Sequence, residues 1–172
     1  FTNNLRLFLN QNAICILQLY TFFMVNKRPE KTGKSFENNI EAQLVNQGYK
    51  KVKAKDFNEL SQESSDKIYA SQFLLGENIY NGRQIVDFII SRQNAEPLVI
   101  QAKWQQSKGS VDEKFPFLII NLKEKNPFQS LVVIDGGGYR SDAITWMKEQ
   151  IDDKLIGVFS YSEFMIWSND EL

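Results

Sequence analysis

The residues with the clearest potential for chemistry lie in two neighbouring apolar segments. Asp87 interrupts the segment Ile85–Ile90, and Lys103 interrupts the segment Leu98–Trp104. A charged side chain in such surroundings is costly unless it is paired or binds an ion. Because strand side chains alternate, Gln101 and Lys103 share one face of the second segment, and Asp87 comes beside them if the segments pair as a hairpin. The spacing predicts a polar site made of a carboxylate, an amide and an ammonium.

The residue types that are missing narrow the chemistry. The 172 residues include no histidine and one cysteine, Cys15. This excludes Ser-His-Asp and Cys-His nucleophiles, His-ligated metals, structural zinc sites and disulfide frameworks. Carboxylate and amide oxygens favour hard cations, so Mg²⁺ is the expected metal, with Mn²⁺ as a substitute. The charge balance, 20 Lys+Arg against 21 Asp+Glu, lacks the basic character of a general nucleic-acid binder.

Further motifs extend the pattern around these residues. Val86-Asp87 is followed by residues 101–105, Gln-Ala-Lys-Trp-Gln, and by residues 109–116, Gly-Ser-Val-Asp-Glu-Lys-Phe-Pro. Residues 33–37, Gly-Lys-Ser-Phe-Glu, precede them. Together these motifs resemble the PD-(D/E)XK nuclease superfamily, whose fold is restriction-endonuclease-like, over most of residues 33–164. Valine stands where that family usually has the proline before its aspartate.

The resemblance implies a role for each candidate residue. Asp87 would be the central metal ligand, Gln101 and the backbone carbonyl of Ala102 further ligands, Lys103 the catalytic lysine, and Glu37 an auxiliary acid. Gln101 replaces the family's usual acidic residue. An amide oxygen can still ligate Mg²⁺, although the lost negative charge should weaken binding. We expect Lys103 to position the attacking water or to stabilise charge in the transition state.

The activity implied by the resemblance is that of a metal-dependent DNA endonuclease, either a type II restriction endonuclease of a restriction-modification system or its catalytic domain. Double-stranded DNA is the expected partner, the cytoplasm the expected location, and symmetric cutting of a duplex would suggest a homodimer. Gln105, Ser107 and Lys108 are candidates for contact with DNA phosphates. A solvated loop at the end of the strand explains these three residues equally well.

Other interpretations of the site residues remain open. A buried structural ion pair would explain Asp87 and Lys103, and an ordinary surface position on a helix would explain Glu37. If Gln101 marks a loss of activity, the protein is a catalytically weak or inactive nuclease-fold protein that binds nucleic acid. A domain that binds a protein partner and has no enzymatic activity is a third hypothesis.

A nucleotide-hydrolase interpretation rests on Gly33-Lys34-Ser35 and on the apolar run that ends at Asp135. The P-loop signature requires glycine where Arg28 stands, which argues against it. The three glycines at positions 136–138 are typical of a tight turn, although glycines also let backbone amides approach a phosphate.

The first segment of the chain differs from the rest. Residues 1–23 contain a single charge, Arg6. The apolar stretch Ala13–Val25 is shorter than the ~20 residues that a membrane span needs, so no membrane association is expected. We therefore expect residues 1–23 to be an N-terminal extension outside the functional domain, and residues 24–172 to form a single nuclease-like domain.

The periodicity of apolar residues predicts an α/β fold, with a central mixed β-sheet flanked by helices. Strands are expected at Ile79–Ile90 (bending at Asn81-Gly82), Leu98–Trp104, Leu131–Ile134 and Ile156–Phe159, and helices around Phe36/Ile40/Leu44/Val45, Phe115/Leu118/Ile119/Leu122 and Ala143/Ile144/Met147/Ile151. Gly48 is expected to end the first helix and Ser162 to cap a terminal one.

Overall fold

The computed structural model describes residues 33–63, 66–109 and 111–172, so the predicted extension 1–23 lies outside the described residues. The chain divides into a unit of Phe1–Glu30 and a unit of Lys31–Leu172. In chain order the described elements are α2 (Gly33–Asn46), β1 (Lys50–Lys51), η1 (Ala54–Asp56), α3 (Phe57–Glu63), β2 (Ile68–Glu77), β3 (Arg83–Arg92), β4 (Ala95–Trp104), η2 (Val111–Lys114), α4 (Phe115–Ile120), η3 (Asn121–Lys125), β5 (Gln129–Asp135), α5 (Ser141–Glu149), β6 (Leu155–Ser160) and α6 (Tyr161–Glu171).

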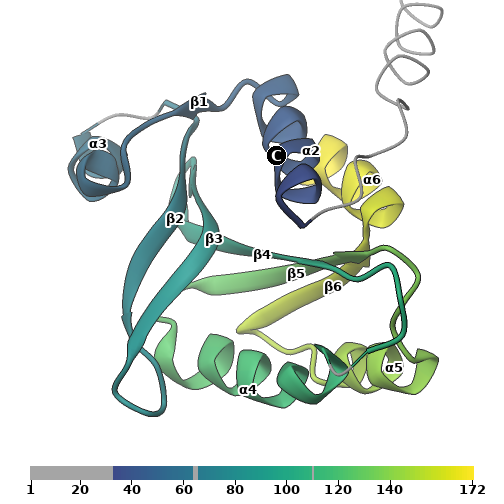
Figure 1. The fold of residues 1–172 in the computed structure, drawn as a ribbon. Helices are drawn as coiled ribbons and strands as arrows, with labels where there is room; N and C mark the ends of the chain where they lie inside the picture. Colours follow the sequence, from purple (N-terminus) through teal and green to yellow (C-terminus); the bar gives the residue numbers. More distant parts are fainter. Residues whose placement is uncertain (1–32, 64–65, 110) are drawn as a thin grey trace, which may run out of the picture. The chain divides into compact units, whose positions relative to one another are not determined.

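The second unit is built around one six-stranded mixed sheet with the strand order β1-β2-β3-β4-β5-β6. Strands β2, β3 and β4 are antiparallel neighbours, whereas β4, β5 and β6 are parallel and β1 is parallel to β2. Figure 1 shows α2 and α6 on one face of the sheet and α4 and α5 on the other. The predicted α/β class with a central mixed sheet is confirmed.

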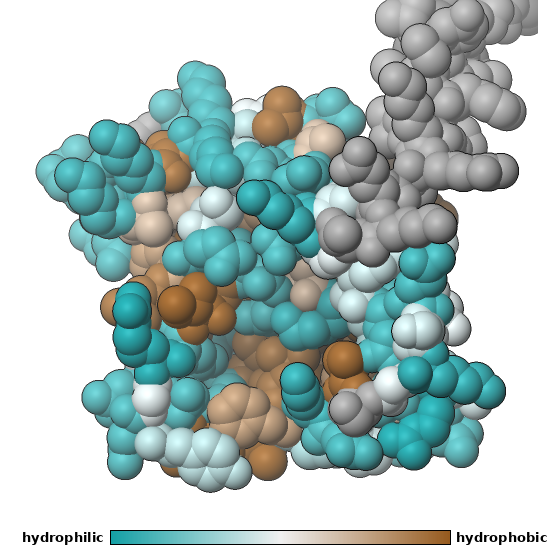
Figure 2. Space-filling model, in the orientation of Figure 1, coloured by the Kyte–Doolittle hydropathy of each residue, from teal (hydrophilic) through white to brown (hydrophobic). Residues whose placement is uncertain are grey.

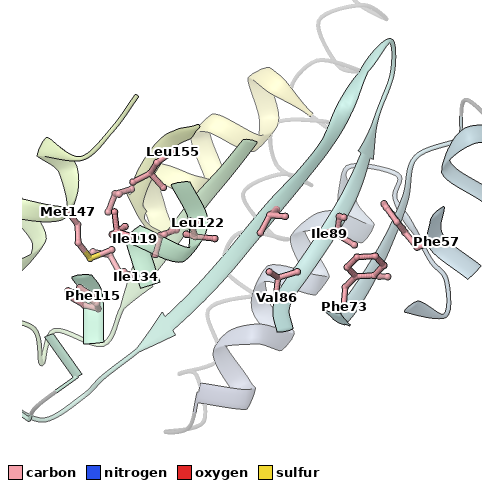
Figure 3. Packing of buried hydrophobic residues seen from close by; sticks show 14 of the residues in the cluster. Phe57, Phe73, Val86, Ile89, Phe115, Ile119, Leu122, Ile134, Met147 and Leu155 are labelled. Atoms are coloured by element: carbon pink, nitrogen blue, oxygen red, sulfur yellow. The ribbon is translucent and has the colours of Figure 1, made fainter. Parts of the chain in front are cut away.

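Each face of the sheet has its own apolar core. On the face of α2 and α6, Phe36, Ile40 and Phe164 pack against Ile100 and other residues of the strands. On the face of α4 and α5, the core extends from α3 across the sheet to α5 (Figure 3), with members that include Phe57, Phe73, Val86, Ile89, Phe115, Ile119, Leu122, Ile134, Met147 and Leu155. Because both faces are covered, strand β5, which lies between β4 and β6, is buried on both sides, as its continuous apolar sequence predicts.

The main error in the predicted elements concerns β2. The expected strand Ile79–Ile90 begins only at Arg83, and Asn81-Gly82 lies in the hairpin turn between β2 and β3, where Asn78 N donates to Gly82 O at 2.7 Å. Strand β2 itself was missed because irregularities interrupt its alternation. Gln72 adopts φ 51°, and the register shifts between Leu74 and Gly76.

The helix ends show smaller differences. Gly48, with φ +87°, follows α2 as predicted, since glycine readily adopts this conformation. The cap of α6 is Ser160 rather than Ser162, because Ser160 Oγ accepts from Glu163 N and the Glu163 carboxylate accepts from Ser160 N. Val45 is exposed on α2, and Ile151 lies beyond the end of α5 and is exposed.

Candidate active site

The candidate site lies where β3 and β4 separate. Toward the site, the last paired residues of the two strands are Phe88 and Ile100. Just beyond them, the backbone N–H of Ala102 donates to Asp87 Oδ2 at 2.8 Å. The carboxylate therefore accepts a hydrogen bond from the backbone N–H that lies beyond the last strand pair. This bond holds Asp87 at the fork, the point where β3 and β4 separate. The position of Asp87 follows from the sheet itself.

The predicted residues meet at this fork. Lys103 Nζ lies 3.1 Å from Asp87 Oδ2, 2.9 Å from Gln101 Oε1 and 3.0 Å from the carbonyl oxygen of Ala102. Gln101 and Lys103 share one face of β4, as alternation predicts, and both line a cleft on the side of α4. The Asp87 side chain is 16% exposed and that of Lys103 is 28% exposed. The charged groups are thus paired but remain within reach of solvent.

Glu37 approaches the same groups from α2. Its Oε2 accepts from Gln72 Nε2 at 3.3 Å, so the irregular part of β2 helps to orient it. Burial, followed by the negative charge of Asp87, raises the pKa of Glu37, while the positive charge of Lys103 opposes this rise. Phe36 and Ile40, which are buried, anchor the helix beside the site. The negative charges of Glu37 and Asp87 favour a cation in their neighbourhood.

The donor set fits a hard divalent cation. In the part of the chain that the structure describes, no group of three or more His, Cys, Asp or Glu residues could hold a metal ion. The oxygens of Asp87, Gln101 and Ala102 nevertheless converge on one cationic group, the Lys103 ammonium. Carboxylate, amide and backbone carbonyl oxygens are ligands that Mg²⁺ and Ca²⁺ accept. A metal here would therefore depend on two neutral oxygens besides the carboxylates.

The three candidates for DNA contact are placed differently. Ser107 and Lys108 are exposed in the loop after β4. Gln105 is buried, and its Nε2 donates to Gly138 O at 3.2 Å while its backbone oxygen accepts from Gly138 N at 2.8 Å. This placement argues against a phosphate contact by Gln105. Its side chain instead supports the loop of three glycines at positions 136–138, here called the glycine loop.

The glycine loop packs against backbone. A Cβ on Gly136 would lie 2.3 Å from Gln105 O, and one on Gly138 would lie 2.6 Å from Ser107 O. Gly136 also has φ +107°, a conformation that favours glycine. The close approach of two loops accounts for these glycines, which favours the turn interpretation over a phosphate-binding one.

A salt bridge that the sequence analysis did not predict, between Asp112 and Arg140, lies near this loop. Asp112 Oδ2 accepts from Arg140 Nε at 2.8 Å and from Arg140 N at 3.2 Å. The hydrogen bond from the Arg140 side chain lowers the pKa of Asp112, and Asp112 in turn raises the pKa of Arg140. The Asp112 side chain is 2% exposed. The pair ties the segment before α4 to the start of α5.

A cleft of about 260 Å³ opens directly beside Gln101 and Lys103. Its lining comes from β3, β4 and α4 and from the segments around them: Asn78, Arg83, Gln84, Ile85, Val111, Lys114, Phe115, Phe117, Leu118, Asn121 and Leu122. Figure 2 shows a hollow in the lower half of the view, with apolar residues on its floor and both hydrophilic and apolar residues around it. No sequence motif indicated this cleft, because its residues are spread over β3, β4, η2, α4, η3 and the turn between β2 and β3.

Comparison with known families agrees with this geometry. Residues 28–172 match the PD-(D/E)XK nuclease superfamily domain, so the chain belongs to this superfamily and has the restriction-endonuclease-like fold. The family supports a nuclease-type hydrolase that acts on nucleic acid and generally depends on a divalent metal. No curated protein and no solved structure matches the chain. In the described part of the chain, no helix is both long enough and apolar enough to span a membrane.

Proposed function

We propose that the protein is a Mg²⁺-dependent DNA endonuclease, namely a type II restriction endonuclease or its catalytic domain, which acts on double-stranded DNA in the cytoplasm. The observation that carries the proposal is the convergence of the Asp87, Gln101 and Ala102 oxygens and the Lys103 ammonium at one point. In a member of a nuclease superfamily, a buried structural ion pair would not need the additional oxygens or the adjoining cleft.

The chemistry divides between the metal and the side chains. Asp87, Gln101 Oε1 and the Ala102 carbonyl would hold the ion, with Glu37 as an auxiliary acid. When bound, the ion neutralises charge on the phosphodiester and lowers the pKa of a bound water. The bond from Ala102 N fixes the Asp87 carboxylate before substrate arrives. Lys103 lies beside these oxygens, where its ammonium orients the attacking water and stabilises the charge that develops on the phosphate.

The direct test is nicking of supercoiled plasmid DNA in Mg²⁺ or Mn²⁺. Cleavage that EDTA abolishes and added metal restores supports the proposal, and cleavage that persists in EDTA contradicts it. Cutting of both strands at one position would support a homodimer, because one site cuts one strand. Cleavage of RNA in preference to DNA would overturn the substrate assignment.

Gln101 favours a second candidate, a weak or inactive nuclease fold that binds nucleic acid. With an amide in place of the acid, the site has one negative charge fewer to hold Mg²⁺. This candidate predicts DNA binding at low salt without nicking. A Gln101→Glu variant that gains cleavage would then identify the missing charge as the cause.

We also propose that residues 24–172 form the nuclease domain, supported by the family match over residues 28–172. A chain that starts at Met24 should retain the nicking activity of the full chain. Loss of folding in this truncated chain, measured by circular dichroism, would show that residues 1–23 belong to the domain.

A further inference from the structure

The cleft beside the candidate active site has a composition suited to a flat, partly polar ring. Its apolar side chains come mainly from α4 and its neighbours, and include Ile85, Phe115, Phe117 and Leu118. Phe117 is 38% exposed and stacks with Tyr80, whose ring centroid lies 5.3 Å away at an interplanar angle of 21°. Exposed aromatic faces of this kind are surfaces on which bases stack. A volume of about 260 Å³ admits one ring system and not a duplex.

Besides Gln101 of the candidate active site, three amide side chains line the cleft, and two of them make hydrogen bonds that hold neighbouring segments of the fold in place. Asn78 Oδ1 accepts from the backbone N–H groups of Tyr80 and Gly82. Asn121 Oδ1 accepts from Ile79 N at 2.8 Å. Asn121 Nδ2 donates to the carbonyl oxygen of Phe117 in α4 at 2.6 Å. These two asparagines therefore hold the β2–β3 turn and the end of α4 in place.

Gln84 is the exception. Its side chain is buried, with 8% of the residue exposed, and its Nε2 donates to Asn121 O at 3.4 Å. This bond orients the amide, and Oε1 is left buried with no hydrogen-bond partner among the described residues. An acceptor in that state destabilises a fold unless a ligand supplies the missing donor.

We propose that this cleft binds one unpaired nucleobase of the nucleic-acid substrate, whose exocyclic amino group donates to Gln84 Oε1. The inference rests on the proposed nuclease function and names the part of the substrate that enters next to the cleaved phosphate. Adenine, cytosine and guanine carry such an amino group. Arg83 and Lys114, which also line the cleft, supply positive charge for the adjoining phosphates of the nucleic-acid backbone.

The base must be unpaired because the cleft admits one base and no base pair, and a paired base keeps its faces stacked and its pairing edge occupied. Its source is either a single-stranded segment or a base extruded from a duplex. Both present the same ring and amino group, so the experiment includes one probe for each source.

The test compares Gln84→Met with Gln43→Met in the full chain. Methionine matches glutamine in length but has no amide. Gln43 is a matched control on α2, which lies at the opposite face of the sheet. It is also buried, and its Nε2 donates to Ser168 Oγ at 2.8 Å and to Asn169 Oδ1 at 3.2 Å. Binding is measured by fluorescence anisotropy in EDTA, with labelled single-stranded deoxyadenosine oligonucleotide, an abasic strand of equal length, and a dA·dT duplex.

We expect Gln84→Met to weaken binding of the deoxyadenosine strand about tenfold and to leave the abasic strand unaffected. Its Tm should rise, since the orphaned acceptor is removed, whereas Gln43→Met should lower Tm and leave binding unchanged. An equal loss of affinity for the duplex would show that the base is extruded from a duplex. A loss of affinity confined to the single strand would show that the base comes from an unpaired segment. Phe117→Ala, at an exposed ring, should weaken the same probe about tenfold through lost stacking.

Two results would overturn the inference. One is unchanged binding of the deoxyadenosine strand by Gln84→Met or, should that variant not fold, by Phe117→Ala. The other is an equal loss of affinity for the abasic strand, which would show that the variant disturbs contacts with the sugar-phosphate backbone and not with a base. If the wild-type chain nicks plasmid DNA in either case, the proposed function stands and this inference alone fails. A wild-type chain that neither nicks DNA nor binds any probe overturns both.

Discussion

Two carboxylate–cation pairs in this protein have similar distances and different surroundings. Lys103 Nζ lies 3.1 Å from Asp87 Oδ2, and Arg140 Nε lies 2.8 Å from Asp112 Oδ2. Around Lys103, two further oxygens converge and a cleft opens. Around Asp112, one carboxylate oxygen takes both Arg140 bonds, and the other is buried with no hydrogen-bond partner among the described residues. The ion pair alone therefore does not distinguish the two places; the additional oxygens and the adjoining cleft set the proposed active site apart.

The largest effect expected from this contrast is on cleavage by Asp87→Asn. The amide retains an acceptor for Ala102 N, so the fork between β3 and β4 should persist. The negative charge that would hold the metal is lost, and cleavage should fall about 100-fold or more. Initial rates of plasmid nicking and a Tm measured by circular dichroism report the two quantities separately.

Asp112→Asn is the matched control for this variant. It should lower Tm by a few degrees, because it removes the charge that bonds twice to Arg140, and it should leave cleavage by the folded protein nearly unchanged. If both variants lost cleavage to the same extent, the distinction between the two pairs would be wrong.

Replacing the cation of the first pair should separate binding from chemistry. Lys103→Met removes the ammonium that lies within 3.1 Å of three oxygens, and with it a positive charge that repels a metal at the same place. Cleavage should fall about 100-fold, as for loss of a group that stabilises transition-state charge. Mg²⁺ affinity, measured by calorimetry, should stay the same or rise. A weaker affinity would show that Lys103 supports the metal site instead of competing with it.

Substitutions in the glycine loop that precedes Arg140 should lower the stability of the fold without changing cleavage by the folded protein. Gly136→Ala places a Cβ 2.3 Å from Gln105 O at φ +107°, and should lower the free energy of unfolding by about 2 kcal/mol. Gly137→Ala shares a positive φ, +71°, but meets no atom within 4 Å. Urea unfolding of both variants isolates the contact from the backbone strain. Equal losses would mean that the close approach of the loops is unimportant.

The smallest effect concerns a third pair, in which Lys123 Nζ lies 2.7 Å from Asp152 Oδ2. The hydrogen bond from Lys123 lowers the pKa of Asp152 to about 2, and the backbone N–H groups of Leu155 and Lys154 contribute. Since the folded pKa is below the unfolded one, about 3.9, the stabilisation is present above pH ~4 and is lost as pH falls toward 2. Asp152→Asn should therefore lower Tm slightly at pH 7 and not at pH 2. A loss of equal size at both pH values would contradict this linkage.

Much of the architecture was predictable because local patterns and tertiary packing agree. The continuous apolar run in β5 predicts its burial on both faces, and the alternation in β4 predicts that Gln101 and Lys103 share a face. Strand β2 was missed because Gln72 and the shift near Gly76 break its period of two.

The site was predictable only in part. Asp87 and Lys103 stand out as charges in apolar strands, whereas Gln84 and Asp112 carry no local signal, since their importance arises from burial and from distant partners. The burial of Gln105 could not be foreseen either, because the glycine loop that covers it lies about 30 residues further along the chain.

Anomalous scattering of Mn²⁺ in a crystal of the wild-type protein would test the proposed metal site directly. We predict an anomalous peak within coordination distance of the Asp87 carboxylate, Gln101 Oε1 and the Ala102 carbonyl oxygen, and no such peak for Asp87→Asn. A wild-type crystal in saturating Mn²⁺ that keeps Lys103 Nζ bonded to the three oxygens, with no peak beside them, would contradict it.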